Sequence, residues 1–198
     1  MKKIIAILFL LSFSIANATT ILFLGDSLTE GYGLNKEAAY PSLVEARIAA
    51  QLDKTVEVIN GGVSGSTTSD GLARLKWYLK KNPDIVFIAL GANDGLRGLD
   101  LKESQKNLEQ IIRRAKEAGA KVVLAGMLIP PNYGPTYTKA FKEMYETLKT
   151  QHDLKMLPFL LEGVAGKKEY NQNDGIHPNA AGHEIIAEHV VEFLKEEL

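Results

Sequence analysis

Short apolar runs alternate with amphipathic stretches along this chain, and no other feature of the sequence limits its fold as strongly. The runs are rich in Ile, Val, Leu and Phe and lack polar alternation, which is typical of parallel strands buried on both faces. They span residues 20–24, 56–59, 85–90, 122–127 and 155–160. The stretches between them have the apolar spacing of helices and span residues 40–52, 69–81, 101–118, 137–152 and 180–195.

This alternation predicts an α/β fold in which each strand is followed by a helix. Right-handed crossovers place helices on both faces of one sheet, so we predict a three-layer, doubly wound, five-stranded parallel sheet of the flavodoxin-like type. No repeat, low-complexity tract or linker interrupts the pattern, and residues 19–198 are therefore predicted to form one domain. In such sheets a ligand binds beyond the carboxyl ends of the strands.

The first 18 residues have the three parts of a secretory signal peptide. Lys2 and Lys3 precede an apolar run over residues 4–15, and Ala16-Asn17-Ala18 offers small residues for cleavage. The run is too short to cross a bilayer core, which needs roughly 20 residues. We predict cleavage after residue 18, export to a bacterial periplasm and no stable membrane insertion of the mature protein. A buried first strand and an uncleaved anchor are the alternatives.

Composition excludes several kinds of function. The chain has 23 Lys and Arg against 24 Asp and Glu, a net charge of -1, so it has no basic surplus to neutralise nucleic-acid phosphates. It has no cysteine, which excludes disulfide scaffolds, thiolate nucleophiles and cysteine-ligated metals. His183 and His189 lack metal-ligand spacing on the last predicted helix, and with His152 they are interpreted as surface or helix-end residues.

Four Gly-rich polar segments fall at one edge of the predicted sheet. They are Gly25-Asp26-Ser27-Leu28 after the first strand, residues 60–66 after the second, Gly91-Ala92-Asn93-Asp94 after the third, and residues 173–178 before the last helix. Because the carboxyl ends of parallel strands share one edge, these segments can converge although they are far apart in the sequence.

The four segments hold the groups that acyl transfer requires, namely a hydroxyl nucleophile, a base and donors for the oxyanion. Ser27 can supply the nucleophile, and His177 is the histidine placed in a loop at that edge. Asp174 lies three residues earlier and can reach Nδ1 of His177, which leaves Nε2 facing Ser27. The backbone amides of Ser27 and Gly65 and the side-chain amide of Asn93 can stabilise the oxyanion.

Each of these signals has a simpler interpretation when it is taken alone. Asp26 can cap a helix in an ordinary turn, Asp174 can be a turn residue, and Asn93 can cap the third helix. Their joint occurrence in an α/β pattern favours the catalytic interpretation.

The four segments resemble the four sequence blocks of the SGNH (GDSL) hydrolase family, whose name lists its Ser, Gly, Asn and His. Ser27, Gly65, Asn93 and His177 fill those positions, and Asp174 matches the Asp of the D-x-x-H block. Residues 94–98, 131–134 and 157–159 look like the branch with bacterial periplasmic thioesterase I, lysophospholipase and arylesterase. The resemblance covers the whole mature chain and implies the SGNH hydrolase fold, with Ser27, Asp174 and His177 as catalytic residues.

We therefore expect a periplasmic serine esterase that hydrolyses ester or thioester bonds of small acyl substrates or lysophospholipids. It is expected to work as a monomer through an acyl-enzyme on Ser27, without metal or organic cofactor. In the resembling branch, the loop matching residues 95–99 closes over bound acyl chains. The residues expected to bind the acyl group are Leu96, Leu99, Ile129, Pro131, Tyr133 and Ile176.

Two alternatives remain open. A carbohydrate O-deacetylase of the same family would use the same catalytic groups on a different substrate. A non-catalytic, flavodoxin-like ligand-binding module would use the same strand ends without chemistry.

Overall fold

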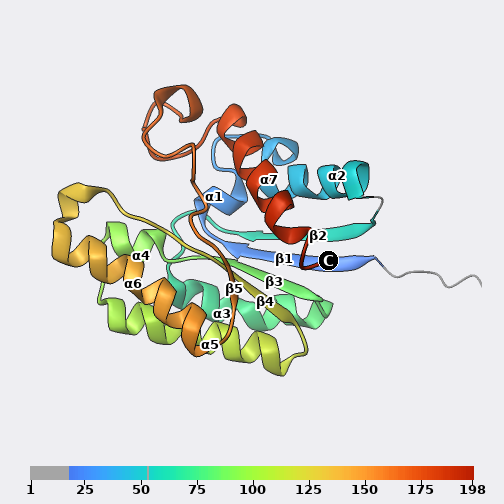
Figure 1. Cartoon of the computed structure of the whole chain (residues 1–198), viewed down its shortest axis with the longest axis horizontal. Helices are drawn as coiled ribbons and strands as arrows, with labels where there is room; N and C mark the ends of the chain where they lie inside the picture. The colour runs from blue at the N-terminus through green and yellow to red at the C-terminus, as the bar shows by residue number, and fades with distance from the viewer. Residues whose placement is uncertain (1–17, 53) are drawn as a thin grey trace, which may run out of the picture.

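The computed structural model describes residues 18–52 and 54–198. All of the predicted signal peptide except Ala18 therefore lies outside the described residues. Within them, one sheet is covered by helices on both faces (Figure 1).

The sheet consists of five parallel strands in the order β2-β1-β3-β4-β5. From β1 the chain turns outward to β2, then crosses back past β1 to β3 and continues in the opposite direction, as in flavodoxin-like sheets. β3 is buried along its whole length, as its apolar sequence predicts. The strands span β1 (Thr19–Gly25), β2 (Val56–Gly62), β3 (Ile85–Ala89), β4 (Lys121–Ala125) and β5 (Lys155–Leu157).

The long helices form the two outer layers (Figure 1), and the predicted three-layer, doubly wound fold is confirmed. α2 (Tyr40–Leu52) and α7 (Ala180–Leu194) lie side by side on one face. The other face is covered by α3 (Thr68–Tyr78), α5 (Leu101–Glu117) and α6 (Pro135–Gln151).

Shorter elements complete the order. Two short helices, α1 (Ser27–Glu30) and α4 (Ala92–Leu96), follow β1 and β3. Single 3₁₀ turns occur at η1 (Lys36–Ala38), η2 (Leu79–Lys81), η3 (Pro131–Tyr133) and η4 (Lys168–Tyr170).

The structure differs from the prediction mainly at strand ends. β2 continues to Gly62, beyond residue 59, because its last residues still pair with β1. β4 and β5 end earlier than predicted, at Ala125 and Leu157. Gly126 N–H still donates to the Leu157 carbonyl, but the Gly126 carbonyl accepts from Leu160 N–H, one residue beyond the position that a regular parallel ladder would use. Residues 92–96, predicted as loop, form α4.

The buried side chains between the sheet and its two helix layers form one continuous hydrophobic core. α5 contributes Leu108, Ile111, Ile112 and Ala115, which share one helix face. Among residues 18–52 and 54–198, no helix is long and apolar enough to cross a membrane.

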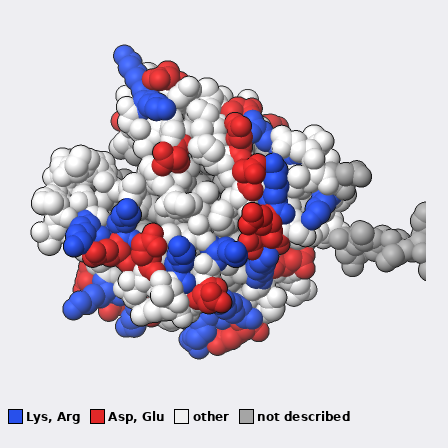
Figure 2. Space-filling model, viewed as in Figure 1, with Lys and Arg blue, Asp and Glu red and all other residues white. Residues whose placement is uncertain are grey.

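Charged side chains of both signs are interspersed on the face drawn in Figure 2. The end of the molecule that carries η3 and the start of α6 is white in this view. Residues 126–138, which form this end, contain no Lys, Arg, Asp or Glu. An uncharged surface therefore adjoins α4, to which Tyr133 of η3 is hydrogen-bonded at 2.7 Å.

Candidate active site

The strand order brings two of the predicted segments together where the winding of the sheet reverses. β1 and β3 are hydrogen-bonded neighbours, so the turns that follow Gly25 and Ala89 lie side by side. In doubly wound sheets this reversal point is where ligands bind. Ser27 follows β1 and Asn93 follows β3, so both are placed there.

A tight turn after β1 places Ser27 at the first position of α1. Asp26 caps the helix, since its buried carboxylate accepts a hydrogen bond of 3.0 Å from Leu28 N–H. Gly25 permits the turn, because a Cβ at this position would lie 1.9 Å from Oγ1 of Thr29. The side chain of Ser27 is left partly exposed at the carboxyl edge of the sheet.

Asp26 is a buried carboxylate beside the candidate nucleophile. Burial raises its pKa to about 6, although the Leu28 N–H, His177 and Arg74 act in the opposite direction. The second oxygen of Asp26 lies 3.5 Å from Nδ2 of Asn93. Asp26 therefore carries its charge only above about pH 6 and faces the amide of Asn93.

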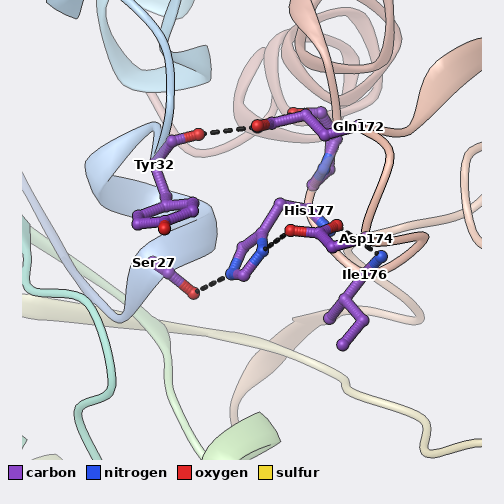
Figure 3. Close-up of polar contacts among 7 residues, drawn as sticks. Ser27, Tyr32, Gln172, Asp174, Ile176 and His177 are labelled. Carbon is purple, nitrogen blue, oxygen red and sulfur yellow. Dashed lines mark hydrogen bonds and ion pairs between the residues drawn. The ribbon is translucent and has the colours of Figure 1, made fainter.

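Ser27, His177 and Asp174 form a line of hydrogen bonds (Figure 3). Oγ of Ser27 lies 3.0 Å from Nε2 of His177, and Nδ1 of His177 lies 2.8 Å from Oδ2 of Asp174. The other oxygen of Asp174 accepts hydrogen bonds from the backbone N–H groups of His177 and Ile176 at 3.0 and 2.9 Å. This arrangement can hold a proton on Nδ1 and leave Nε2 free to accept one from Ser27.

Hydrogen bonding keeps Asp174 ionised. The backbone N–H of His177 contributes most, followed by its ring and by the Ile176 N–H, and together they lower the pKa of Asp174 to about 2. The carboxylate is therefore charged at any pH near neutrality and stabilises an imidazolium at His177.

Two residues with no predicted role support the imidazole. The ring of Tyr32 lies beside that of His177, with centroids 4.6 Å apart (Figure 3). Gln172 donates from Nε2 to the Tyr32 carbonyl at 2.7 Å and from its backbone N–H to the His177 carbonyl at 2.8 Å. Because Tyr32 and Gln172 are 140 positions apart, no local sequence pattern indicates this contact.

The three predicted oxyanion donors come from three different segments. Among the described residues, the backbone N–H groups of Ser27 and Gly65 have no acceptor. Asn93 donates from Nδ2 to the carbonyl of Ser66 at 3.0 Å, and its other near contact is the 3.5 Å one to Asp26. Asn93 is thereby joined to the loop that contains Gly65.

Asp94, the last residue of the Gly91-Ala92-Asn93-Asp94 segment, fixes α4. It is buried and accepts hydrogen bonds from the N–H and hydroxyl of Thr68 at 2.9 and 2.7 Å and from the hydroxyl of Ser104 at 2.9 Å. These bonds tie α4 to the first turns of α3 and α5. Asn93 therefore projects from a helix that is held on two sides.

Arg74 on α3 was also missed, because it belongs to no motif. Its guanidinium donates to the Ser66 hydroxyl at 2.9 Å and to the carbonyls of Gly25 and Gly61. Arg74 therefore joins the ends of β1 and β2 to the loop that follows β2.

The residues expected to bind the acyl group occupy different places. Tyr133 in η3 contacts the α4 segment of Leu96, since its hydroxyl donates to the Leu96 carbonyl. Leu99 is exposed just beyond α4, and Tyr137 donates to its carbonyl at 3.1 Å. Three of the six, Leu96, Leu99 and Tyr133, are thus brought together.

The other three take no part in these two hydrogen bonds. Pro131 is exposed in η3, and Ile176 is 53% exposed next to His177 in the sequence. Ile129 is buried against Gly95 of α4.

The interpretation of His183 as a surface or helix-end residue is wrong. Its side chain is buried, its Nδ1 accepts a hydrogen bond of 3.0 Å from Tyr40 N–H, and burial lowers its pKa to about 4. The hydroxyl of Tyr40 in turn bonds Oγ1 of Thr29 in α1 at 2.9 Å. Within the described part of the chain, no group of three or more His, Asp or Glu side chains could hold a metal ion.

The chain matches a family model described as the GDSL-like Lipase/Acylhydrolase family over residues 23–185. The matched range contains the line of Ser27, His177 and Asp174 and the donors Gly65 and Asn93.

Curated relatives match almost the whole chain. The arylesterase of Vibrio mimicus is 40% identical over 195 residues, which cover 98% of this chain and 97% of that protein. Thioesterase 1/protease 1/lysophospholipase L1 of Escherichia coli (strain K12) is 39% identical over 189 residues, which cover 95% of this chain and 89% of that protein.

Solved structures agree with these relatives. The psychrotrophic esterase EstA from Pseudoalteromonas sp., in a crystal structure described as inhibited by monoethylphosphonate, has a TM-score of 0.86 and 35% sequence identity. The match covers 90% of this chain and 98% of that one.

Proposed function

The chain belongs to the GDSL-like lipase/acylhydrolase family of serine ester hydrolases, and on this premise we propose that it cleaves acyl esters and thioesters through an acyl-enzyme on Ser27. The observation that carries the proposal is the unbroken line from Ser27 Oγ to His177 and Asp174, with bonds of 3.0 and 2.8 Å. A ligand-binding module has no need of an ionised carboxylate that orients a histidine toward a serine hydroxyl.

In the first half of the reaction, Ser27 Oγ attacks the carbonyl carbon while Nε2 of His177 takes the hydroxyl proton. The carbonyl electron pair moves onto oxygen, where the amides of Ser27, Gly65 and Asn93 stabilise the negative charge. The tetrahedral intermediate then expels the alcohol or thiol, which receives the proton held by His177. The acyl group stays on Ser27.

In the second half, water replaces the leaving group. His177 takes a proton from the water as it attacks the acyl carbonyl, and the same three donors stabilise the second oxyanion. Collapse of this intermediate returns the proton to Ser27 Oγ and releases the acid. Asp174 stays ionised throughout and stabilises the imidazolium in each half.

The surroundings of the site favour acyl chains as substrates. Leu96 and Leu99 lie next to the uncharged end formed by residues 126–138, to which Tyr133 belongs. The names of the two curated relatives, an arylesterase and a thioesterase 1/protease 1/lysophospholipase L1, agree with this class of substrate.

A substrate panel tests this function. We expect purified protein to hydrolyse p-nitrophenyl esters from acetate upward, together with acyl-CoA and lysophospholipid, measured by release of nitrophenol, thiol or fatty acid. Release of acetate from acetylated oligosaccharides, with none of these acyl substrates cleaved, would instead indicate a carbohydrate O-deacetylase. Turnover of none of them would contradict the proposal.

We also propose that the enzyme works in a periplasm after removal of residues 1–18. The basis is the order of Lys2 and Lys3, the apolar run and Ala16-Asn17-Ala18 in the sequence. N-terminal sequencing of the protein recovered from a bacterial periplasmic fraction is expected to begin at Thr19. Recovery of the chain with Met1 in place, confined to the cytoplasm, would contradict export.

Truncation of Leu96 or Leu99 is expected to weaken hydrolysis of medium-chain esters more than that of acetate. Each buried methylene contributes about 0.8 kcal/mol at most, so the binding free energy that apolar side chains provide increases with the length of the acyl chain. The measurement is the ratio of kcat/KM for p-nitrophenyl octanoate to that for acetate in Leu96→Ala and Leu99→Ala. Leu52→Ala, at the far end of α2, is the matched control. Equal losses on both esters would mean that these residues do not select the chain.

A further inference from the structure

The loop that follows β2 carries the backbone N–H of Gly65 at a left-handed φ of +76°. This N–H belongs to the peptide that joins Ser64 to Gly65, so its direction depends on the peptides on either side. A side chain at Gly65 would be strained at this φ. Residues 63–67 of this loop form no helix or strand. Contacts with neighbouring elements must therefore orient the loop.

Glu30, the last residue of α1, binds the preceding peptide of the loop, which joins Val63 to Ser64. Oε2 of Glu30 accepts a hydrogen bond of 2.8 Å from Ser64 N–H and another from the Ser64 hydroxyl. Because Glu30 and Ser27 lie on the same short helix, this contact fixes the loop relative to the candidate nucleophile.

Arg97, which caps the C-terminus of α4, binds the following peptide of the loop, which joins Gly65 to Ser66. Its guanidinium donates to the Gly65 carbonyl at 2.9 Å. The N–H of the same peptide, on Ser66, donates to the Val63 carbonyl at 3.1 Å. Arg97 follows closely on Asn93, so this contact fixes the loop relative to the side-chain oxyanion donor.

We propose that Glu30 and Arg97 are positioning residues that set the direction of the Gly65 amide in the oxyanion hole. The peptide that joins Ser64 to Gly65 lies between the two peptides that Glu30 and Arg97 bind, and its N–H has no acceptor among the described residues. Within that part of the chain, both charged side chains make their hydrogen bonds to this loop and to nothing else. Bonds with one charged partner are roughly twice as strong as neutral ones and preserve a donor's direction.

This proposal rests on the proposed acyl transfer. It predicts a kinetic effect that loss of acyl-chain binding would not produce. A misdirected Gly65 amide weakens only the bond to the developing oxyanion, so kcat falls while KM is preserved. Loss of the donor itself typically costs about 10²–10³ in kcat, so loss of its positioning is expected to cost about tenfold. The factor is expected to be the same for acetate and octanoate.

The test compares Arg97→Ala and Glu30→Ala with wild type on p-nitrophenyl acetate and octanoate. We expect kcat to fall about tenfold on both esters with KM within about twofold. Affinity for a small alkylboronic acid, whose adduct with Ser27 places an oxygen in the oxyanion hole, is expected to fall by the same factor as kcat/KM. Arg97→Lys and Glu30→Gln keep a donor and an acceptor and are expected to recover part of the loss.

Arg113→Ala and Glu103→Ala remove exposed charges on α5 and serve as matched controls with unchanged kinetics. If wild type does not cleave the esters, the proposed function fails. If wild type cleaves them and the Arg97 and Glu30 variants keep its kcat, only the positioning proposal is overturned. It is equally overturned if KM alone rises, if the two esters lose activity by different factors, or if boronate affinity is unchanged while kcat falls.

Discussion

Replacement of Ser27 by alanine is expected to abolish ester hydrolysis while the fold stays intact. Among the described residues, the hydroxyl of Ser27 bonds only to His177, so its removal leaves the buried carboxylate of Asp26 and its helix cap in place. Loss of the nucleophile in a serine hydrolase can lower kcat by about 10⁶-fold, because the remaining groups have no acyl acceptor to activate. Initial rates on p-nitrophenyl acetate measure the loss of hydrolysis, and the thermal melting temperature shows whether the fold is intact.

Ser69→Ala is the matched control, since this serine is exposed at the start of α3 and takes no part in the line of hydrogen bonds. It is expected to retain wild-type kinetics. Activity that persists in Ser27→Ala at more than about a thousandth of wild type would contradict the assignment of the nucleophile.

The second large effect is expected at the base. His177→Ala is predicted to lose about as much activity as Ser27→Ala, because the hydroxyl then has no group to take its proton. Asp174→Asn is expected to cost about 10⁴-fold or less, since the amide keeps the size of the carboxylate but no longer holds the proton on Nδ1. Residues that act as a unit are not additive, so the double variant is expected to be no worse than His177→Ala. A double variant that is much worse would contradict a shared role.

The pH dependence of the reaction has a definite sign. The pKa of Asp174 is lowered to about 2, so this carboxylate does not limit the rate at mildly acid pH. Protonation of Asp26, whose pKa is raised to about 6, is expected to lower kcat/KM as the pH falls below neutrality.

Asp26 affects stability in the opposite direction. Its folded pKa lies above its ordinary value of 3.8, so between about pH 6 and 4 the folded state takes up a proton before the unfolded state does. Its contribution to the free energy of unfolding therefore rises as the pH falls through this range. The buried His183 opposes this rise, because its folded pKa is lowered to about 4 and the unfolded state takes up its proton first as the pH falls below 6.5. The two contributions largely offset one another, so we expect activity to decline from pH 7 to 5 with only a small change in melting temperature. Parallel losses of both would mean that acid unfolding causes the decline.

The fold and the line of polar residues could be predicted because their signals are local. Each buried strand is an apolar run in the sequence, and Ser27 lies in a Gly-Asp-Ser turn at the end of the first. Asp174 and His177 are three positions apart, which is close enough for one turn to bring them together. Parallel strands then place these turns at one edge.

The supporting residues could not be predicted, because their partners are distant in the sequence. Arg74 reaches the Gly25 carbonyl from 49 positions away, and His183 reaches Tyr40 from 143. His183 looks like a surface residue on an amphipathic helix, and only the packing of α7 against α2 buries it. Ile129 likewise follows a strand as a loop residue would, but α4 covers it.

Mass spectrometry after treatment with a fluorophosphonate probe tests the central claim most directly. The probe reacts with a serine hydroxyl that a neighbouring base has activated, and its phosphonyl group remains on that oxygen. The account predicts one phosphonyl group for each chain, on the peptide that contains Ser27, with labelling slowed by p-nitrophenyl octanoate and lost in Ser27→Ala and His177→Ala. Labelling of a different residue, or full ester hydrolysis by protein that the probe leaves unlabelled, would contradict it.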